Sequence, residues 1–444
     1  MQTVSFRLVM ISEAMPNPRE IHERRLRCLW LTRLDPVSPD AGDLSYSFHL
    51  ITNLGRAGVR LTVLAAARPG NCTRRPTVDG VEWCLFMRKK KDAGSLGRSA
   101  LWSLFSCLPN VAARHKTAAF RRELHAQLAK EWNAIIVDHL GMGWAWRSVE
   151  AYRRRNPRVV SVFIAHNYEG DARRIMAQNF RGHIFRKLAL RVDAVKAGLL
   201  EREIVRSSTL FSVITTEDRD RFGNLPKSVL LTPGYAGMPA HSRAITSTTP
   251  RRALMFGSAF WLAKQMNLVE FIEAADELFS RNQIELWVVG RVPDYLHAKN
   301  VRATRFLGFV EDPEPIFRSV RIGIVAERTG GGFKLKTLDY IFNRVPIAAI
   351  KGSIAGLPLT PDVHYLSFGS MWELANGVAT VIDDIARLNT LQQAAYNQCE
   401  RDFDWSARGR TLYNAIREAV NANMASTQGT RQHERAAGYQ DYRG

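Results

Sequence analysis

The residues most suggestive of chemistry form a glycine-rich turn in the second half of the chain. Gly330, Gly331 and Gly332 follow a short apolar run, and a helix is predicted to begin near Phe333. A glycine-rich loop at a helix N-terminus presents free backbone N–H groups and the positive end of the helix dipole. This combination favours the binding of a phosphate group.

Charged side chains in the same helix strengthen the phosphate interpretation. Lys334 and Lys336 lie in its first turn, where lysine opposes the helix dipole unless an anion is bound. Asp339 lies about one turn further along and could accept hydrogen bonds from ribose hydroxyls. A loop that only requires positive φ, followed by a solvated basic turn, is the simpler alternative. The combination of glycines, lysines and Asp339 favours the phosphate site.

Two histidines in the first half stand at the ends of predicted strands. His139 closes the run AIIVDH, and His166 closes VVSVFIAH. The carboxyl ends of parallel strands line the ligand crevice of a doubly wound sheet, so both side chains are expected to face it. Glu169 follows His166 closely and is a candidate to orient it or to bind an acceptor. A purely structural role for each histidine is the equally weighted alternative.

No metal site is expected. The five cysteines are scattered and form no C-x-x-C pair, which fits a reducing compartment and argues against structural zinc. No serine, histidine and aspartate set suited to nucleophilic catalysis stands out in the sequence.

The elements that must position these residues alternate between strand and helix. Short apolar runs rich in β-branched residues predict parallel strands that helices cover on both faces. In the first half they lie at about 27–33, 59–67, 134–139, 159–166 and 210–215. In the second half they lie at about 252–258, 284–290, 304–309, 321–327 and 345–351. We therefore expect an α/β protein with two Rossmann-like, doubly wound domains that face each other across a cleft.

The predicted organisation has six parts. They are an N-terminal extension at 1–26, a first α/β domain at 27–238, a polar linker at 239–252, a second α/β domain at 253–405, a closing helix at 406–420, and a polar tail at 421–444 that we expect to be disordered.

The composition suits this organisation and narrows the classes of function. With 46% hydrophobic and 23% charged residues, the 444-residue chain can build more than one packed core. No apolar run approaches about 18 residues, so no membrane-spanning helix is expected. The net charge of +20 is concentrated in residues 1–238, which carry 38 Lys and Arg against 21 Asp and Glu. Such a field favours a polyanionic partner: an acidic membrane, a phosphorylated ligand or nucleic acid.

The glycine-rich segment resembles the donor-binding motif of GT-B glycosyltransferases, especially family 4 (group 1). That motif has the form G-x-G-x-K-x-K-x-L-E, followed by G-x-P-V-V and a glycine loop. Gly330, Gly332, Lys334, Lys336 and Leu338 match its first part, and Asp339 stands where glutamate is usual. Residues 345–347 (VPI) match the following strand, and residues 352–356 match the loop after it.

Further matches extend this resemblance over about residues 27–420. Gly42 and Asp43 lie where the family has an N-terminal glycine loop and its helix. Gly257 and Lys264, seven residues apart, resemble the opening of the donor domain, where such a lysine contacts the donor phosphates. Phe403 lies in the F-x-W start of the closing helix.

The resemblance implies a metal-independent, retaining glycosyltransferase with no cofactor other than its nucleotide-sugar substrate. The acceptor would be a glycan or lipid-linked glycan in polysaccharide or glycoconjugate assembly, bound by the first domain. The resemblance gives His139 and His166 catalytic roles near the donor sugar, and it places Gly42 and Asp43 on the acceptor side. Glu169 joins the acceptor-side candidates through its position after His166. It assigns donor binding to Gly257, Lys264, Gly330, Gly331, Gly332, Phe333, Lys334 and Asp339.

Departures from the family pattern keep a second hypothesis open. Gly331 stands where the first acid of a Glu-x7-Glu pair would lie, and Ser258 stands where an arginine is common. The alternative is therefore a catalytically degenerate GT-B-fold protein that binds an anionic ligand or a membrane surface.

The basic half of the chain has a local focus. Arg88, Lys89, Lys90 and Lys91 precede a predicted amphipathic helix that carries Trp102 and Phe105. A basic cluster beside such a helix suits an anionic membrane surface, and a crossover helix with a solvated basic loop is the alternative. Nucleic acid is less favoured because no reader motif accompanies the charge. We expect a cytoplasmic protein, peripheral at the inner membrane face if this surface docks there.

Overall fold

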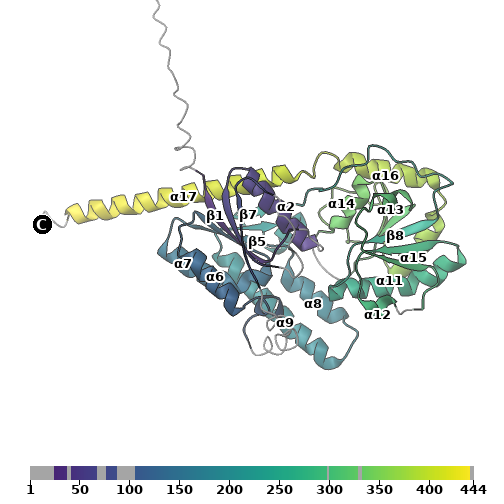
Figure 1. Cartoon of the computed structure of the whole chain (residues 1–444), viewed down its shortest axis with the longest axis horizontal. Coiled ribbons are helices and arrows are strands. Elements are labelled where there is room, and N and C mark those ends of the chain that lie inside the picture. The colour runs from purple at the N-terminus through teal and green to yellow at the C-terminus, as the bar shows by residue number, and fades with distance from the viewer. Residues whose placement is uncertain are drawn as a thin grey trace, which may run out of the picture.

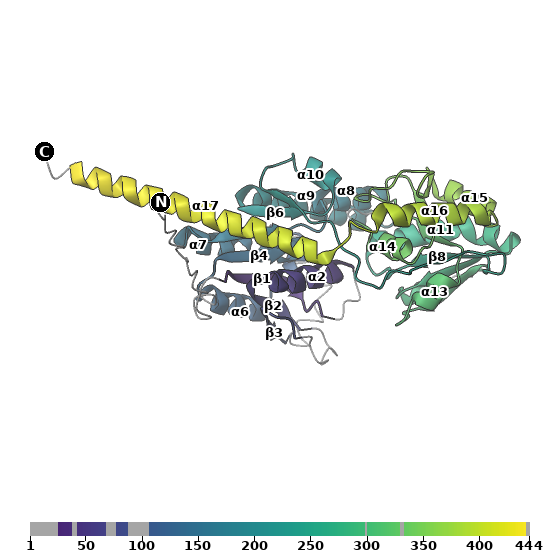
Figure 2. The same cartoon turned by 90° about the horizontal axis from the view of Figure 1, so that it is seen from above.

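The computed structural model describes residues 25–37, 42–67, 77–87, 106–297, 300–328 and 333–440, with side chains described as far as residue 425. Within these residues the chain forms two α/β domains that lie side by side (Figure 1). The long C-terminal helix starts beside the second domain and returns along the first (Figure 2). The expected fold class, two doubly wound domains, is confirmed.

The first domain is built on a seven-stranded parallel sheet of order β3-β2-β1-β4-β5-β6-β7. Its strands are β1 (Arg27–Leu34), β2 (Arg60–Ala66), β3 (Val81–Phe86), β4 (Ala134–Asp138), β5 (Val160–Ile164), β6 (Leu210–Val213) and β7 (Ser228–Leu230). The described helices between them are α2 (Gly42–Arg56), α5 (Asn110–Ala113), α6 (Ala118–Leu128), the 3-10 helix η1 (Leu140–Ala145), α7 (Trp146–Arg155), α8 (Glu169–Asn179), α9 (Ile184–Ser207) and α10 (Thr216–Arg221).

The central strands are apolar along their whole length because both faces of the sheet are covered. On β1, Leu29 and Leu31 enter the core on one face, whereas Cys28 and Trp30 enter the core on the other. All four side chains are fully buried. This two-sided burial explains why the apolar runs do not alternate with polar residues.

The second domain is built on a six-stranded parallel sheet of order β10-β9-β8-β11-β12-β13. Its strands are β8 (Arg252–Phe256), β9 (Glu285–Val289), β10 (Thr304–Gly308), β11 (Ile322–Val325), β12 (Ile347–Ile350) and β13 (Leu366–Phe368). Its described helices are α11 (Leu262–Arg281), α12 (Asp294–His297), α13 (Glu314–Arg318), α14 (Leu335–Phe342), α15 (Met371–Val381) and α16 (Ile385–Cys399).

The chain crosses between the domains twice, and the two crossings lie against each other. The backbone N–H of Tyr235, on the first crossing, donates to the carbonyl of Phe403 on the second at 2.8 Å. The Nε of Arg408 donates to the carbonyl of Thr232 at 2.7 Å. Gly234 packs so closely that a Cβ there would lie 2.6 Å from the backbone nitrogen of Trp405.

The stretch that we expected to be a linker, 239–252, is packed onto the second domain. Ile245 is 2% exposed in that domain's core, and Asn389 hydrogen-bonds both its backbone N–H and its carbonyl. The actual passage between the domains is therefore the shorter segment that follows β7.

Helix α17 (Trp405–Gln440) closes the structure on the first domain rather than on the second. Leu412, Ile416 and Val420 are buried with residues of α2 and β1. The helix continues to Gln440, whereas the sequence predicts a disordered tail from residue 421. A packed first part removes the cost of nucleation, and helix-forming alanine, glutamine and arginine residues can then propagate it.

Candidate functional site

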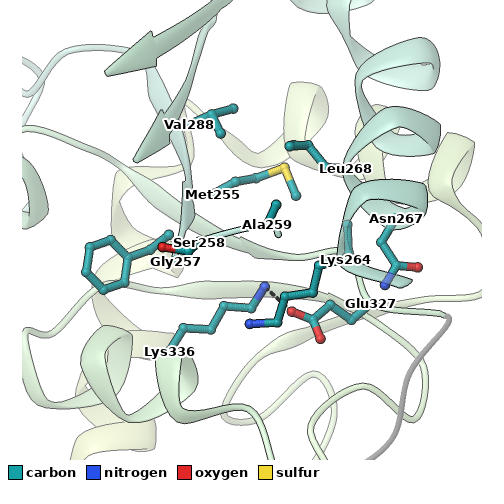
Figure 3. Close-up of a pocket in the computed structure, with 12 residues that line it drawn as sticks. Met255, Gly257, Ser258, Ala259, Lys264, Asn267, Leu268, Val288, Glu327 and Lys336 are labelled. Carbon is teal, nitrogen blue, oxygen red and sulfur yellow. Dashed lines mark ion pairs between the residues drawn. The ribbon is translucent and has the colours of Figure 1, made fainter. Parts of the chain in front are cut away.

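Three lysines surround one buried carboxylate at the carboxyl edge of the second sheet. Glu327 follows β11, and its side chain is 7% exposed. The Nζ of Lys336 lies 2.5 Å from its Oε1, and the Nζ of Lys334 lies 3.2 Å from its Oε2. Lys264, from the first turn of α11, lies beside this ion pair, and its charge acts on the same carboxylate (Figure 3). The cluster thus joins the start of α11 to residues 327–336, which lie far from it in the sequence.

The electrostatics of this cluster favour anions. Burial by itself would raise the pKa of the Glu327 carboxyl, but the charges of Lys336, Lys334 and Lys264 hold it well below its usual range. Burial lowers the pKa of the Lys264 ammonium, and Glu327 opposes that shift. Three ammonium groups share one carboxylate in a low-dielectric setting, where charge interactions are strong.

A small pocket lies beside the lysine cluster. Its lining includes Gly257, Ser258, Lys264, Asn267 and Lys336, and its cavity volume is about 30 Å³ (Figure 3). This is room for roughly one water molecule.

Two glycines bring the chain close together at the edge of this pocket. Gly257, directly after β8, has φ +107°, and Gly290, directly after β9, has φ +125°. A Cβ on Gly290 would lie 2.5 Å from the carbonyl carbon of Gly257. Only glycine suits both the positive φ and this close approach.

Asp339 lies on the next turn of α14. Its side chain is partly buried, and burial raises its pKa to about 7. The charge of Asp339 in turn helps to raise the pKa of the nearby Tyr235 phenol, although burial of that phenol is the larger cause. Phe333, just before α14, packs near Phe403 with 6.2 Å between ring centroids. Gly330, Gly331 and Gly332 lie outside the described residues.

A second charged network lies at the carboxyl edge of the first sheet. Asp138, the last residue of β4, is fully buried. Its Oδ1 lies 2.6 Å from the Nε2 of His166, and its Oδ2 accepts a hydrogen bond from the Nε1 of Trp30 at 3.1 Å. Burial opposes ionisation of Asp138, but the charge and hydrogen bond of His166 outweigh it and lower the pKa of this carboxyl.

His139 lies directly beside this network. Its ring centroid is 5.0 Å from that of His166. The backbone N–H of Gly141 donates to its Nδ1 at 2.8 Å, so the ring proton belongs on Nε2, which lies 3.7 Å from Oε1 of Glu169. Burial, followed by the charge of Arg33, lowers the pKa of His139 well below its usual value. His139 is therefore a neutral imidazole that can donate a hydrogen bond from Nε2.

The backbone of His139 is also unusual. Its φ of +71° is rare for a residue with a side chain. Such strain persists only where the surrounding structure holds it, and it is common at functional sites. The strain turns the chain sharply from β4 into η1 and keeps the ring next to His166.

The remaining acceptor-side candidates lie where the two domains meet. Asp43, in the first turn of α2, forms an ion pair with Arg33, whose pKa burial lowers to about 10. A Cβ on Gly42 would lie 3.2 Å from Cδ1 of Leu335, the first residue of α14. The start of α2 therefore contacts the start of the helix that carries Lys336 and Asp339.

Sequence reasoning missed two central residues. Asp138 was hidden inside a predicted strand, although its position before His139 at a strand end was a usable signal. Glu327 was noted only as a strand-end residue and as the carboxylate nearest to the missing acid of the family pattern, because nothing in the sequence shows that the chain folds the lysines back onto it. Among the described residues, no group of three or more histidine, cysteine, aspartate or glutamate side chains is placed to hold a metal ion.

The basic cluster and its helix fall outside the structural description. Arg88, Lys89, Lys90, Lys91, Trp102 and Phe105 are not among the described residues. Of the helices in the described part of the chain, none combines the length and apolar character needed to span a bilayer.

Comparison with known proteins identifies the second domain by sequence. Residues 250–384 match the family model Glycosyl transferases group 1. This segment contains Gly257, Lys264, Glu327, Lys334 and Asp339. No curated protein matches the chain.

Comparison with solved structures extends the likeness to both domains. HepE from Anabaena, solved with UDP and glucose, is 13% identical with a TM-score of 0.56, over 89% of this chain and 100% of that one. WaaG, a glycosyltransferase involved in lipopolysaccharide biosynthesis, is 14% identical with a TM-score of 0.56, over 88% and 99%. The α,α-trehalose 6-phosphate synthase of Burkholderia multivorans is 12% identical with a TM-score of 0.57, over 90% and 99%.

At these identities the solved structures establish the architecture, and the family match establishes the sequence pattern around the lysine cluster. The chain is thus a two-domain protein of the GT-B glycosyltransferase fold, and residues 250–384 in its second domain match the family model of the group 1 glycosyl transferases.

Proposed function

We propose that this protein is a glycosyltransferase that moves a sugar from a nucleotide-sugar donor to a glycan or lipid-linked acceptor. The observation that carries the proposal is the lysine cluster around Glu327 at the carboxyl edge of the second sheet. It lies inside the segment that matches group 1 glycosyl transferases. HepE, which shares the fold, was solved with UDP and with UDP-glucose, and this supports a nucleotide-sugar donor.

In this proposal the donor diphosphate replaces Glu327 as the partner of the lysines. Lys264, Lys334 and Lys336 would then stabilise the negative charge that develops on the leaving nucleotide diphosphate. Three ammonium groups can do this without a metal ion, so we propose metal-independent transfer. Undiminished turnover in the presence of EDTA would agree with that part of the proposal, and loss of turnover would oppose it.

The ribose and the sugar would lie on either side of the diphosphate. Asp339, one turn into α14, is proposed to accept hydrogen bonds from the ribose hydroxyls. His139 and His166 are proposed to face the donor sugar, His139 as a donor from Nε2 and His166 in the orientation that Asp138 fixes. Retention of the anomeric configuration follows the family resemblance, and the glycan-assembly role agrees with the involvement of WaaG in lipopolysaccharide biosynthesis.

A thermal-shift series with UDP-, GDP-, ADP- and dTDP-sugars tests donor binding, because a ligand that binds only the native state raises the melting temperature. The donor that stabilises the protein would then be incubated with candidate glycan acceptors. Release of free nucleotide diphosphate together with a glycosylated product supports the proposal. Absence of stabilisation by every nucleotide sugar would oppose it.

A second candidate function is a GT-B-fold binding protein without transfer activity. The observation that favours it is Glu327, which is the carboxylate beside the glycine-rich turn and which two lysines already engage. The same assay separates the two functions. A catalytically degenerate protein is stabilised by a nucleotide sugar but releases no nucleotide with any acceptor.

A further inference from the structure

Helix α9 carries a row of large apolar side chains that face solvent. Leu188, Val192, Val195 and Leu199 follow one another at intervals of four, three and four residues, which places them on one face of a helix. Ile184 and Phe185 extend the row at the N-terminal end. Exposed fractions are 67% for Ile184, 74% for Phe185, 57% for Leu188, 37% for Val192, 63% for Val195 and 60% for Leu199.

This row, which we name the outer face of α9, is not required for folding of the domain. The opposite face of the helix packs inward through Ala194, Ala197 and Ile204, all of which are buried. On the inner side Glu201 also accepts hydrogen bonds from the backbone N–H groups of Glu169 and Gly170, at the start of α8. A helix of a globular domain needs one apolar face, and α9 has two.

The outer face is also unusual for this molecule. Other exposed large apolar side chains among the described residues, such as Trp372, Phe309 and Met238, are scattered over several elements. Single residues of that kind are normal, whereas a continuous exposed row marks an interaction site. Helices α8 and α9 form a hairpin that projects from the body of the first domain (Figure 1).

Positive charge accompanies the outer face. Between residues 181 and 206 the sequence has seven Arg and Lys against three Asp and Glu, and one of the acids is the buried Glu201. Arg181, Arg186, Arg191, Arg202 and Arg206 are all exposed. Guanidinium groups bind phosphate oxygens, and apolar side chains beside them can enter the acyl boundary of a bilayer.

The charge also distinguishes between two occupants of this face, a second copy of this chain and an anionic lipid surface. A second copy of this chain would bring two sets of arginines together, which is unfavourable. An anionic lipid surface has the opposite charge and attracts each basic residue that lies close to it. We propose that the outer face of α9 docks the protein on an anionic membrane.

Such docking would set the distance between the membrane and the cleft. Glu169 starts α8 and lies 3.7 Å from the Nε2 of His139, so the base of the hairpin reaches the histidine network. A lipid-linked acceptor held in the membrane would therefore meet the protein beside that network. The docking itself does not depend on transfer activity, so it can fail or succeed independently of the function proposed above.

The test is co-sedimentation of the full chain with vesicles of phosphatidylcholine, with and without phosphatidylglycerol. The wild type is expected to bind the anionic vesicles and to be released by salt. The variant Phe185→Ser/Leu188→Ser/Val195→Ser should bind at least about tenfold more weakly, because each side chain loses its burial in lipid. Because all three side chains are exposed, the variant should keep the wild-type melting temperature. Matched controls, Trp372→Ser and Phe309→Ser in the second domain, should bind as the wild type does.

A second variant separates charge from apolar contact. Arg186→Glu/Arg191→Glu/Arg202→Glu should lose the preference for phosphatidylglycerol while its circular dichroism spectrum stays unchanged. The proposal is overturned if the wild type binds neither type of vesicle at low salt, or both equally. It is also overturned if the serine variant binds like the wild type, or if the serine substitutions abolish a dimer while vesicle binding is absent.

Discussion

The carboxyl edges of the two sheets carry charged clusters of opposite design. At the second sheet, three lysines share the single carboxylate of Glu327. At the first sheet, Asp138 is matched by His166 and Trp30, one partner on each oxygen. A cluster with more cations than anions can exchange its carboxylate for a ligand anion. A network in which each carboxylate oxygen has its own partner instead fixes side chains in place. The edge of the first sheet is therefore suited to positioning His166, and the edge of the second sheet is suited to binding an anion.

The largest effect expected from this comparison concerns Glu327. Glu327→Gln leaves three buried or half-buried ammonium groups without their shared carboxylate, so the free energy of unfolding should fall by about 3–5 kcal/mol. Chemical denaturation would measure the loss, and added pyrophosphate should restore more stability to the variant than to the wild type. Glu270→Gln, which removes a more exposed partner of Arg328, is the control and should change stability by about 0–1 kcal/mol. Equal stability of Glu327→Gln and wild type would contradict the exchange interpretation.

Removal of one lysine tests the binding role directly. Lys334→Ala should weaken nucleotide-sugar binding by about tenfold to a hundredfold, since a charge-assisted contact contributes roughly 1.5–3 kcal/mol. Isothermal titration with the donor found in the thermal-shift series would measure this change. Arg281→Ala, an exposed substitution at the far end of α11, should leave affinity unchanged. If Lys334→Ala binds the donor normally, the lysine cluster is not the diphosphate site.

Disruption of the Asp138 network at the first sheet should lower kcat rather than the affinity for the donor. Asp138→Asn removes the charge that orients His166, and we expect kcat for transfer to fall about tenfold, or about 1.4 kcal/mol. The affinity for free nucleotide should stay within error of the wild type, because that contact belongs to the other domain. A loss of nucleotide affinity instead would show that the two clusters are not separate in function.

The smallest effect concerns Asp339. Because burial raises its pKa to about 7, Asp339 is mainly protonated at pH 6 and mainly ionised at pH 8. A carboxylate accepts ribose hydroxyls better than a carboxylic acid, so donor KM should fall by about two- to fivefold over this range. Asp339→Asn should have a higher KM that varies less with pH. The ribose assignment fails if KM rises with pH, or if only acceptor kinetics change.

The central parts of both sheets could be predicted from the sequence because their strands are buried on both faces. Three of the four edge strands, β3, β7 and β13, could not, since they are only partly buried and their sequences are short or mixed, as in VEWCLF. Lys264 and Lys334 could be predicted as partners because their spacing from glycines follows the family pattern. Glu327 and Asp138 could not, because their roles depend on contacts between segments that only the folded chain brings together.

The outer face of α9 escaped prediction for a related physical reason. Periodicity reveals a helix best when one face is apolar and the other polar. On α9 the apolar residues occupy two opposite faces, so the pattern nearly cancels and the exposed row does not stand out. The basic stretch around Lys90 is obvious in the sequence, and the membrane hypothesis was therefore based on it. Those residues lie outside the part of the chain that the structure describes.

The two crossings between the domains have a mechanical consequence. Because Tyr235 and Phe403 are hydrogen-bonded and Gly234 lies against Trp405, the crossings form one hinge rather than two independent tethers. Two rigid bodies joined at one hinge can open and close by rotation but cannot slide apart. The lysine cluster and the histidine network would then approach each other by rotation of the two domains about this hinge. A side chain at position 234 would push the two crossings apart at this hinge. The lysine cluster and the histidine network would then no longer be aligned with each other.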